Sequence, residues 1–491
     1  MNQAEIRRPS IGMALVPILI ALAVFIIGIG VLKYQAELML IFAGAIFAVF
    51  AVFHGHSWEK ILVVMGDKIK KALPAILILF SIGLLIGTWM ISGTIPFFVY
   101  YGLEIINPSY LYVMAFIVTA IVSTCVGTSW GSAGTIGVAL MSIAQTMDLS
   151  LAVTAGAVVS GAYFGDKLSP LSDTTNMSSL AAGSNLYEHI RHMLYTSIPS
   201  SVIAIIVFYF VGLKIDSNPA QLTNVEEMLS GIGQLFNLNV VVLIPAVIVI
   251  AGSLMKKSPL IVLFVSALSA MAIALFFQNA SVSNLFTAAV EGFHVDMLAA
   301  AIPGLDAGII SEDMQGLLNR GGLYSMYGAT FFVFCAFFFA SALEVSQALN
   351  VILEKMITYL KSVGSVIFAS LLTGFAVINC TSNALVTYFL VQDIYGDVYK
   401  KKNLHPVNLS RSMEDSVTIT EALMPWTVSG VFMATTLGVG NFEFLPWAIF
   451  NLGGIIFSAL YGFLAPYTGG FGIRTNEPEA ETGNTSSKTA I

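Results

Sequence analysis

The chain carries very few charged side chains. Lys, Arg, Asp and Glu make up only 10% of its 491 residues, whereas hydrophobic residues make up 57%. A soluble globular domain carries roughly 25% charged residues, so this chain cannot cover a soluble surface. The formal net charge of −7 belongs largely to loops and tails, and no basic cluster suggests contact with nucleic acid. The shortage of charge therefore excludes a soluble protein and argues against a nucleic-acid-binding one.

Cysteine is scarce as well, and familiar catalytic motifs are missing. Cys125, Cys335 and Cys380 lie in apolar surroundings without metal-ligand spacing, so neither a disulfide framework nor a zinc site is expected. The sequence contains no HExxH motif and no nucleotide-binding loop, which argues against an enzyme. We expect no enzymatic activity and no cofactor.

Long apolar runs dominate what is present. Many of them approach the roughly 20 residues that span the hydrocarbon core of a bilayer as a helix. The shorter, alternating pattern of an outer-membrane barrel is absent. The sequence therefore predicts an all-α polytopic membrane protein with about 10–13 transmembrane segments.

Lysine and arginine indicate the orientation in the membrane. Residues 54–71 and 393–411 are rich in these side chains, as is typical of cytoplasmic loops, and Arg7 and Arg8 precede the first apolar run. We expect a multi-pass protein of the cytoplasmic membrane with its N-terminus inside. The predicted organisation is a cytoplasmic N-terminus (1–10), a first transmembrane half (11–213), an extracytoplasmic connection (214–239), a second transmembrane half (240–467) and a polar, disordered tail (468–491).

Two polar stretches interrupt the apolar pattern of the first half. Residues 127–137, GTSWGSAGTIG, are rich in glycine and hydroxyl side chains. Each glycine costs about 1 kcal/mol in a helix interior, so this composition is typical of a broken helix inside a membrane, where protein or water must surround the freed backbone. Residues 161–183, GAYFGDKLSPLSDTTNMSSLAAG, contain Asp166 and Asp173 within a run of hydroxyl and amide side chains.

The second half repeats this pattern. An apolar segment ends in STCVGTSWG (123–131) and another in INCTSN (378–383), and both Asp166 and Glu421 follow the cysteine of their segment by 41 residues. A second register aligns Asp166 and Asp173 with Glu414 and Glu421, because both pairs are seven residues apart. Paired, broken apolar segments in the two halves of a chain point to the binding site of a secondary transporter.

The residue types at these breaks suit a small, hard cation. Such an ion takes oxygen ligands from carboxylates, hydroxyls, amides and backbone carbonyls. A charged carboxylate inside a membrane costs about 2.5–3.5 kcal/mol on insertion scales, and burial favours its protonated form, so it can exchange a proton for a cation. Asp173 is the first choice for the ion carboxylate, followed by Asp166 and Glu421. The other candidate oxygen ligands are Thr128, Ser129, Ser172, Thr174, Thr175, Asn176, Asn379, Thr381, Ser382 and Asn383.

Simpler roles stay open for several of these polar residues. Asp173 and Ser172 can cap a helix start within a cytoplasmic loop, and Asp166 with Lys167 can form an ion pair at the membrane interface. Glu414, Asp415 and Glu421 can lie on an amphipathic face where a helix enters the membrane, with Glu421 expected to be the most buried of the three. Residues 127–137 can also form a small-residue seam between helices.

Three further residues carry weaker signals. His189 and His192 stand three apart, and an interfacial helix explains them better than a metal site does. Arg320 lies beside glycines in GLLNRGG. Two roles are open for Arg320: it can be part of a structural turn, or it can contact an anion if the substrate is a carboxylate.

The chain resembles the NhaC family of sodium/proton antiporters. The similarity rests on GTSWGSAGTIG, GAYFGDKLSPLSDTTNMSSLAAG, LLNRGGLYSM and NCTSNALVTYFLVQD, and it extends over roughly residues 11–466. The resemblance implies the architecture of the ion-transporter superfamily, with two inverted repeats, each containing a re-entrant hairpin, often as a homodimer. It also implies exchange of sodium for protons by alternating access, with sodium held by the candidate ligands above.

The resemblance leaves the substrate open. The same family contains proteins that resemble malate/lactate antiporters, which exchange proton-coupled malate for sodium and lactate, and members linked to amino-acid uptake. An ion-coupled carboxylate exchanger or amino-acid carrier on the same fold is therefore the alternative function, and Arg320 would then hold the carboxylate. A channel, which belongs to a different class, would conduct ions without a coupled proton gradient.

Overall fold

The computed structural model describes residues 8–32, 34–215, 219–255, 257–299, 312–357 and 360–476. This part of the chain is helical, and its β structure is limited to an antiparallel bridge between Leu404 and Thr475. Eight of the described helices are long and apolar enough to cross a membrane, or up to ten spans if each of two bent helix pairs is one. The predicted all-α membrane fold is confirmed, with the number of spans among the described residues at or below the lower edge of the expected 10–13.

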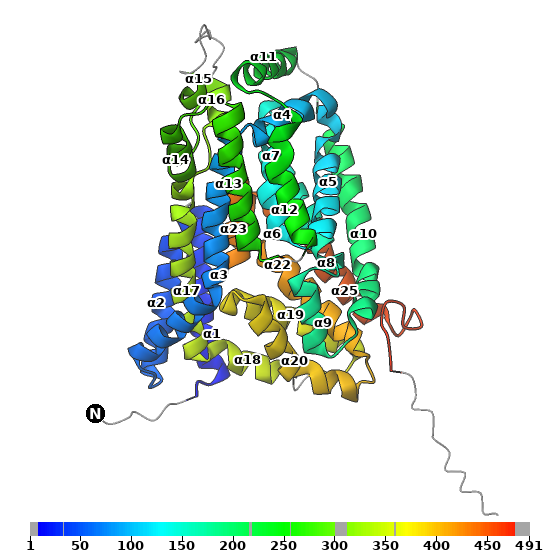
Figure 1. The fold of residues 1–491 in the computed structure, drawn as a ribbon. Helices are drawn as coiled ribbons and strands as arrows, with labels where there is room; N and C mark the ends of the chain where they lie inside the picture. The colour runs from blue at the N-terminus through cyan, green and yellow to red at the C-terminus, as the bar shows by residue number, and fades with distance from the viewer. Residues whose placement is uncertain are drawn as a thin grey trace, which may run out of the picture.

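The long helices form two groups that stand side by side (Figure 1). In the first group, α17 packs against α2 and α3, and α1 packs against α2. In the second group, α5 packs against α8, and α10 packs against α25. The bounds of these helices are α1 (Ile11–Val24), α2 (Ala36–Phe53), α3 (Trp58–Ile91), α5 (Leu111–Val126), α8 (Leu151–Leu168), α10 (Leu186–Gly212), α17 (Tyr327–Ser346) and α25 (Ile449–Leu464).

The remaining helices fill the space between and around the two groups, and two of them, Pro259–Phe277 and Val363–Thr381, are themselves long and apolar enough to cross a membrane. Several of them, such as α7, α12 and α21, are too short to cross a bilayer alone, which explains the low number of spans. Their bounds are α4 (Thr94–Ile105), α6 (Ser129–Ser132), α7 (Val138–Thr146), α9 (Asp173–Ala182), α11 (Pro219–Leu235), α12 (Ile244–Leu254), α13 (Pro259–Phe277), α14 (Val282–Val290), α15 (Asp296–Ala299), α16 (Glu312–Leu318), α18 (Ala348–Ile357), α19 (Val363–Thr381), α20 (Ala384–Lys401), α21 (Pro406–Met413), α22 (Ile419–Glu421), α23 (Val428–Leu437) and α24 (Asn441–Phe444).

Two helices end in the middle of the molecule with the same backbone geometry. Helix α5 ends at Gly127, which is left-handed with φ 75°, and the extended Thr128 precedes α6. Helix α19 ends at Ser382, which is also left-handed with φ 48°, and the extended Asn383 precedes α20. A left-handed residue followed by an extended one stops the helical hydrogen-bond pattern and leaves carbonyl groups free.

The same correspondence continues through the next two helices. Helix α9 begins after the N-cap Ser172 and ends at Gly183, whereas α23 begins after the N-cap Thr427 and ends at Gly438. Each of these positions in the first half lies 255 residues before its counterpart (127 to 382, 172 to 427, 183 to 438). This shift pairs Asp166 with Glu421. The second register considered from the sequence, which paired Asp173 with Glu421, is wrong, because α9 and α23 begin at a new N-cap after each acid-bearing helix has ended.

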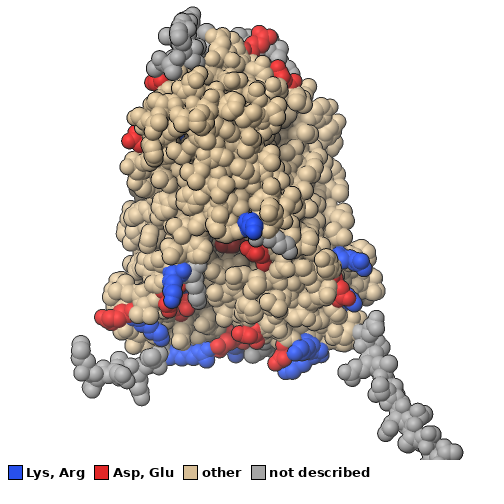
Figure 2. All heavy atoms as spheres, in the orientation of Figure 1, with Lys and Arg blue, Asp and Glu red and all other residues tan. Residues whose placement is uncertain are grey.

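The ends of the molecule differ in charge. Helices α4, α11, α14, α15 and α16 lie at the upper end in Figure 1, whereas α9, α18 and α20 lie at the lower end. On the face drawn in Figure 2, the blue Lys and Arg side chains gather at the lower end, and the upper end shows acidic side chains. The connection predicted at 214–239 contains α11, and residues 477–491 of the predicted tail lie outside the described residues.

Candidate functional site

A cavity of about 580 Å³ lies beside the first helix break. One wall is formed by the break and the loop between α8 and α9, and the other by the facing ends of α12 and α13, which include Lys257. In Figure 2 the drawn face is hollowed below α12 and α13, with charged side chains of both signs at the hollow. The predicted ligands that line the cavity are Thr128, Ser129, Asp166, Ser172, Asp173, Thr174 and Asn176.

Asp166 is the buried carboxylate of this cavity. It lies in the last turn of α8 and is only 5% exposed. Its carboxylate accepts hydrogen bonds from the side chains of Ser129 and Ser172 and from the backbone N–H of Ser129. It forms no ion pair with a basic side chain in the described part of the chain. The interfacial pair with Lys167 that the sequence left open is therefore not formed.

Asp173 occupies a different position in the same cavity. It is the first residue of α9 and is exposed. Ser172 caps this helix by accepting a hydrogen bond from the backbone N–H of Thr175 at 3.4 Å, so helix capping is performed by Ser172. The Asp173 carboxylate is thus at the wall of the cavity, where the partial positive charge of a helix N-terminus favours an anion.

The neighbouring hydroxyl and amide side chains divide into two kinds. Thr175 donates to the backbone carbonyls of Asp166 at 3.2 Å and Lys167 at 3.1 Å. Asn176 donates to the carbonyl of Pro170 at 2.9 Å. These two side chains hold the α8–α9 loop in place. Thr174 lies 3.0 Å from the Ser172 hydroxyl and lines the cavity itself.

Tyr163 connects the first cavity to Glu421. Its side chain hydrogen bonds to both Ser129 and Ser429, and Ser429 in turn hydrogen bonds to Glu421. The two carboxylates that the repeat makes equivalent, Asp166 and Glu421, are therefore joined through two serines and one tyrosine. Tyr163 and Ser429 were not predicted: Tyr163 lies within residues 161–183 but was not among the oxygen ligands considered, and Ser429 lies outside the polar stretches that the sequence indicates.

The second helix break lies beside a smaller cavity. It has a volume of about 130 Å³ and is lined by Thr381, Ser382 and Asn383 together with Asp67, Lys68 and Glu344. The Lys68 ammonium contacts Glu344 at 2.7 Å and the carbonyl of Cys380 at 3.4 Å. A lysine side chain thus already supplies a cation to the carbonyls at this break.

Asn379 is fully engaged outside this small cavity. Its amide nitrogen donates to the carbonyl of Phe375 at 2.7 Å, and its oxygen accepts from Trp426 at 2.7 Å. The predicted ligands of the two halves that line a cavity therefore line separate ones, and Glu421 is connected to the first cavity through Ser429 and Tyr163.

Residues 127–131, GTSWG, also match the GxSxG pattern of a hydrolase nucleophile elbow. In such enzymes the serine sits on a turn between a strand and a helix. Here Ser129 begins α6 after α5, so both flanking elements are helices, and its hydroxyl bonds to a carboxylate and a tyrosine. The structural context does not support a nucleophile at this position.

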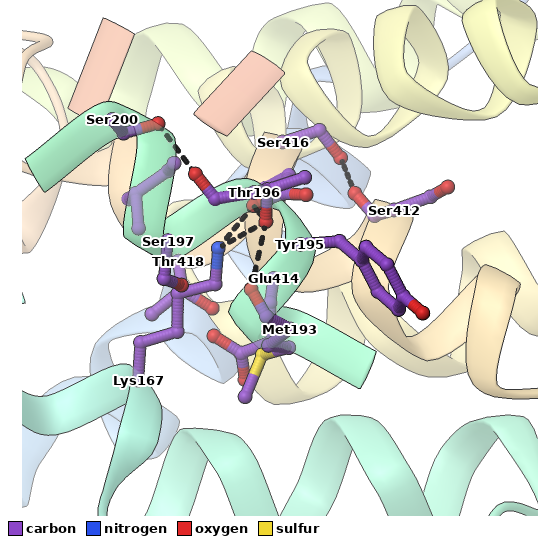
Figure 3. A network of polar contacts seen from close by, with 12 residues as sticks. Lys167, Met193, Tyr195, Thr196, Ser197, Ser200, Ser412, Glu414, Ser416 and Thr418 are labelled. Atoms are coloured by element: carbon purple, nitrogen blue, oxygen red, sulfur yellow. Dashed lines mark hydrogen bonds and ion pairs between the residues drawn. The ribbon is translucent and has the colours of Figure 1, made fainter. Parts of the chain in front are cut away.

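A buried ion pair lies behind the cavity. Lys167 contacts Asp415 of the π-helical segment η7 (Glu414–Thr418), and neither side chain is exposed to solvent. Thr196 of α10 bonds to both groups, at 3.3 Å from the Lys167 nitrogen and 3.2 Å from the Asp415 oxygen. Figure 3 shows Lys167 reaching toward Thr196 from below. Asp415 and Glu414 do not form the amphipathic face that the sequence left open, because both are fully buried.

The two histidines also have a buried environment rather than an interfacial one. His189 is 0% exposed, and its ring nitrogens contact Ser178 at 3.2 Å and Ser410 at 2.7 Å. His192 is 6% exposed. Among the described residues, no three His, Cys, Asp or Glu side chains are arranged to hold a metal ion. The sequence missed this burial because the residues that cover the histidines come from α9 and α21.

Arg320 lies in a third cavity, of about 430 Å³, next to α14 and α16. Its guanidinium contacts the side-chain oxygen of Gln145, and Glu291 and His294 also line the cavity. Arg320 does not line the cavity that contains Asp166.

Comparison with known proteins agrees with these features. The model of the Na+/H+ antiporter family matches residues 161–465. An uncharacterized Na(+)/H(+) antiporter of Haemophilus influenzae is 46% identical over 93% of this chain and 96% of its own length. The Na(+)/H(+) antiporter NhaC of Alkalihalophilus pseudofirmus is 34% identical over 93% and 96%. The malate-2H(+)/Na(+)-lactate antiporter of Bacillus subtilis is 35% identical over 85% and 86%. The chain belongs to the Na+/H+ antiporter family.

Proposed function

We propose that the protein exchanges sodium for protons across the cytoplasmic membrane by alternating access, and that Asp166 binds the two ions in turn. One observation carries this proposal: Asp166 is a buried carboxylate that lines a cavity and has hydroxyl and N–H partners but no basic partner among the described residues. A buried negative charge is stable only with a counter-ion or a proton, so sodium and a proton compete for this position.

The chemistry around Asp166 supports sodium as the cation. Thr128, Ser129 and Ser172 offer hydroxyl oxygens beside the carboxylate, and the break after Gly127 frees carbonyl oxygens. Hard cations prefer oxygen ligands, whereas softer transition metals prefer nitrogen and sulfur. In this proposal Asp173 attracts cations at the cavity wall, because an exposed carboxylate raises the local cation concentration.

The distribution of charge supports an orientation. Lysine and arginine accumulate on cytoplasmic loops, so the lower end in Figure 2 is the cytoplasmic end in this proposal. The hollow on the drawn face lies in the half of the molecule nearer to that end. The structure then represents the state in which the cation cavity is open to the cytoplasm, with the N-terminus inside.

The test is sodium-driven proton movement in proteoliposomes that contain the purified full-length protein. An imposed sodium gradient should change the internal pH of wild-type vesicles, and Asp166→Asn should abolish that change. Asp173→Asn is the matched control, since it alters an acid seven residues away in the same cavity. We expect it to raise the sodium concentration needed for half-maximal flux while leaving the maximal flux largely intact. Full activity of Asp166→Asn would refute the assignment of Asp166.

A carboxylate exchanger is the second candidate function, and the separate cavity that contains Arg320 supports it. A guanidinium is well suited to hold a carboxylate. If this function is correct, sodium-driven proton flux should require added malate or lactate. Arg320→Gln should then abolish this carboxylate-dependent flux. If sodium and protons alone sustain the flux, the carboxylate is not a substrate.

A further inference from the structure

A continuous chain of hydrogen bonds runs from the α9–α10 turn to a buried carboxylate that the cation cavity does not use. It begins at Ser184, whose side chain is half-buried and lies 3.2 Å from Ser410. Ser410 lies 2.7 Å from Nδ1 of His189. The other ring nitrogen, Nε2, lies 3.2 Å from Ser178, and Ser178 donates to Oε1 of Glu414 at 2.8 Å.

Glu414 is the inner end of this chain. Its side chain is 0% exposed and makes no ion pair in the described part of the molecule. The nearby Lys167 is engaged by Asp415 instead. Oε2 of Glu414 has no donor within hydrogen-bond distance among the described residues, and the Thr418 hydroxyl is the other polar group that interacts with this carboxyl. A permanently ionised buried carboxylate needs donors at both oxygens, so this environment suits a carboxyl that carries a proton for part of the transport cycle.

His189 has the geometry of a relay. Both of its ring nitrogens face hydroxyl groups, one on each side, and both hydroxyls are buried. An imidazole can accept a proton at one nitrogen and release another from the second, and a serine hydroxyl can pass a proton in the same way. The unprotonated carboxylate of Glu414 is the final acceptor, so each transfer conserves charge and leaves the relay groups neutral.

We propose that Ser184, Ser410, His189 and Ser178 conduct protons to Glu414 along a path separate from the cation cavity at Asp166. This inference rests on the proposed sodium/proton exchange at Asp166 and adds Glu414 to it as a second proton-binding carboxyl with its own route. Sodium reaches Asp166 through the open cavity, and protons reach Glu414 through the hydrogen-bonded chain.

The charges around Glu414 explain how the two routes are coupled. Glu414 interacts electrostatically with Asp166 and with Lys167. When sodium neutralises Asp166, the repulsion between the two carboxylates falls and Glu414 releases its proton more easily. When sodium leaves, Glu414 gains a proton more easily, and by linkage each ion opposes the other. Other titratable groups that interact electrostatically with this region are Arg411 and His192 beside His189, and Tyr388 beside Glu414.

Two fluxes measured on the same proteoliposomes test the proposal. The first is the internal pH change driven by a sodium gradient. The second is exchange of isotopic sodium for unlabelled sodium at equal concentrations, which needs no net proton movement. Glu414→Gln and His189→Gln should lower the first flux about tenfold or more, since a missing proton-transfer group has effects of at least that size, while the second flux stays within about twofold. Asp166→Asn should lose both.

His192→Gln is the matched control, because His192 lies three residues from His189 on the same helix and contributes no link to the chain. It should retain both fluxes. If Glu414→Gln and His189→Gln keep normal proton coupling, the path is refuted. If both variants lose sodium exchange along with proton coupling while remaining folded, Glu414 belongs to the cation site and the path is also refuted. If wild-type protein moves no sodium in either assay, the proposed function itself fails.

Discussion

At the scale of single residues, the buried charges are the most informative feature. Lys167 and Asp166 are adjacent in sequence, yet Lys167 pairs with Asp415 of the second half, and Asp166 has hydroxyl and backbone N–H partners. Because the partners of Asp166 are hydroxyl groups and the backbone N–H of Ser129, with no basic side chain in the described part of the chain, Lys167 and Asp415 form a structural charge pair while the Asp166 carboxylate stays available to ions. The partner of Lys167 lies 248 residues away, and a sequence pattern does not reveal which distant acid neutralises a given lysine.

The Lys167–Asp415 pair should contribute to stability rather than to ion binding. Lys167→Met leaves Asp415 buried and unpaired, which should cost about 3–5 kcal/mol. The double variant Lys167→Met with Asp415→Leu should recover most of this loss, because it removes the remaining charge as well. Thermal unfolding in detergent, followed by loss of the monodisperse chromatographic peak, measures the difference. Equal stability of the single and the double variant would contradict this account.

At the scale of elements, the helix breaks decide where ligands can be. The 41-residue spacing between cysteine and acid correctly predicted that Asp166 and Glu421 are equivalent, because each cysteine stands two residues before the left-handed residue of its break. The sequence could not predict that the two breaks line different cavities. That outcome depends on side chains from a third element, since Lys68 of α3 occupies the second break.

The two left-handed glycines Gly127 and Gly183 provide a test of the first break. Alanine at either position is strained by the positive φ, by about 1 kcal/mol. A Cβ on Gly127 would also meet the Leu171 backbone at 2.9 Å, whereas a Cβ on Gly183 would meet nothing within 4 Å. Gly127→Ala should therefore weaken sodium-dependent transport markedly, and Gly183→Ala should change it little. Isotopic sodium uptake measures both, and equal effects would show that crowding at the break is unimportant.

At the scale of the whole molecule, the sequence predicted the helical membrane fold and its repeated halves well. The apolar runs are long, and their length alone sets the number of possible spans. Burial in the centre was predicted less well. Arg411 falls in a lysine-rich segment that indicates a cytoplasmic loop, yet its side chain is 0% exposed and donates to the carbonyl of Gly472. Arg411 is covered by the helices packed around α21 and by the segment after α25, where the chain folds back on itself.

The proposed orientation predicts which ends of the molecule a membrane-impermeant reagent can reach in intact cells. In a variant without native cysteines, a cysteine at Lys401 of α20 should react with a membrane-impermeant maleimide only after cells are opened. A cysteine at Glu227 of α11 should react in intact cells. Both positions are exposed and lie at opposite ends of the molecule (Figure 1). The reverse labelling pattern would invert the proposed topology.

The matching backbone at the two breaks has one more consequence. The residues that stop α5 and α19 adopt nearly the same conformations, yet one break faces about 580 Å³ of open space and the other about 130 Å³. Two structurally equivalent helix breaks thus have different surroundings within a single chain, one open and one nearly closed. A motion that exchanges these surroundings would close the cavity at the first break and widen the cavity at the second. The conformation of each repeat in this structure is therefore a model for the conformation of the other repeat in the opposite state of the transport cycle.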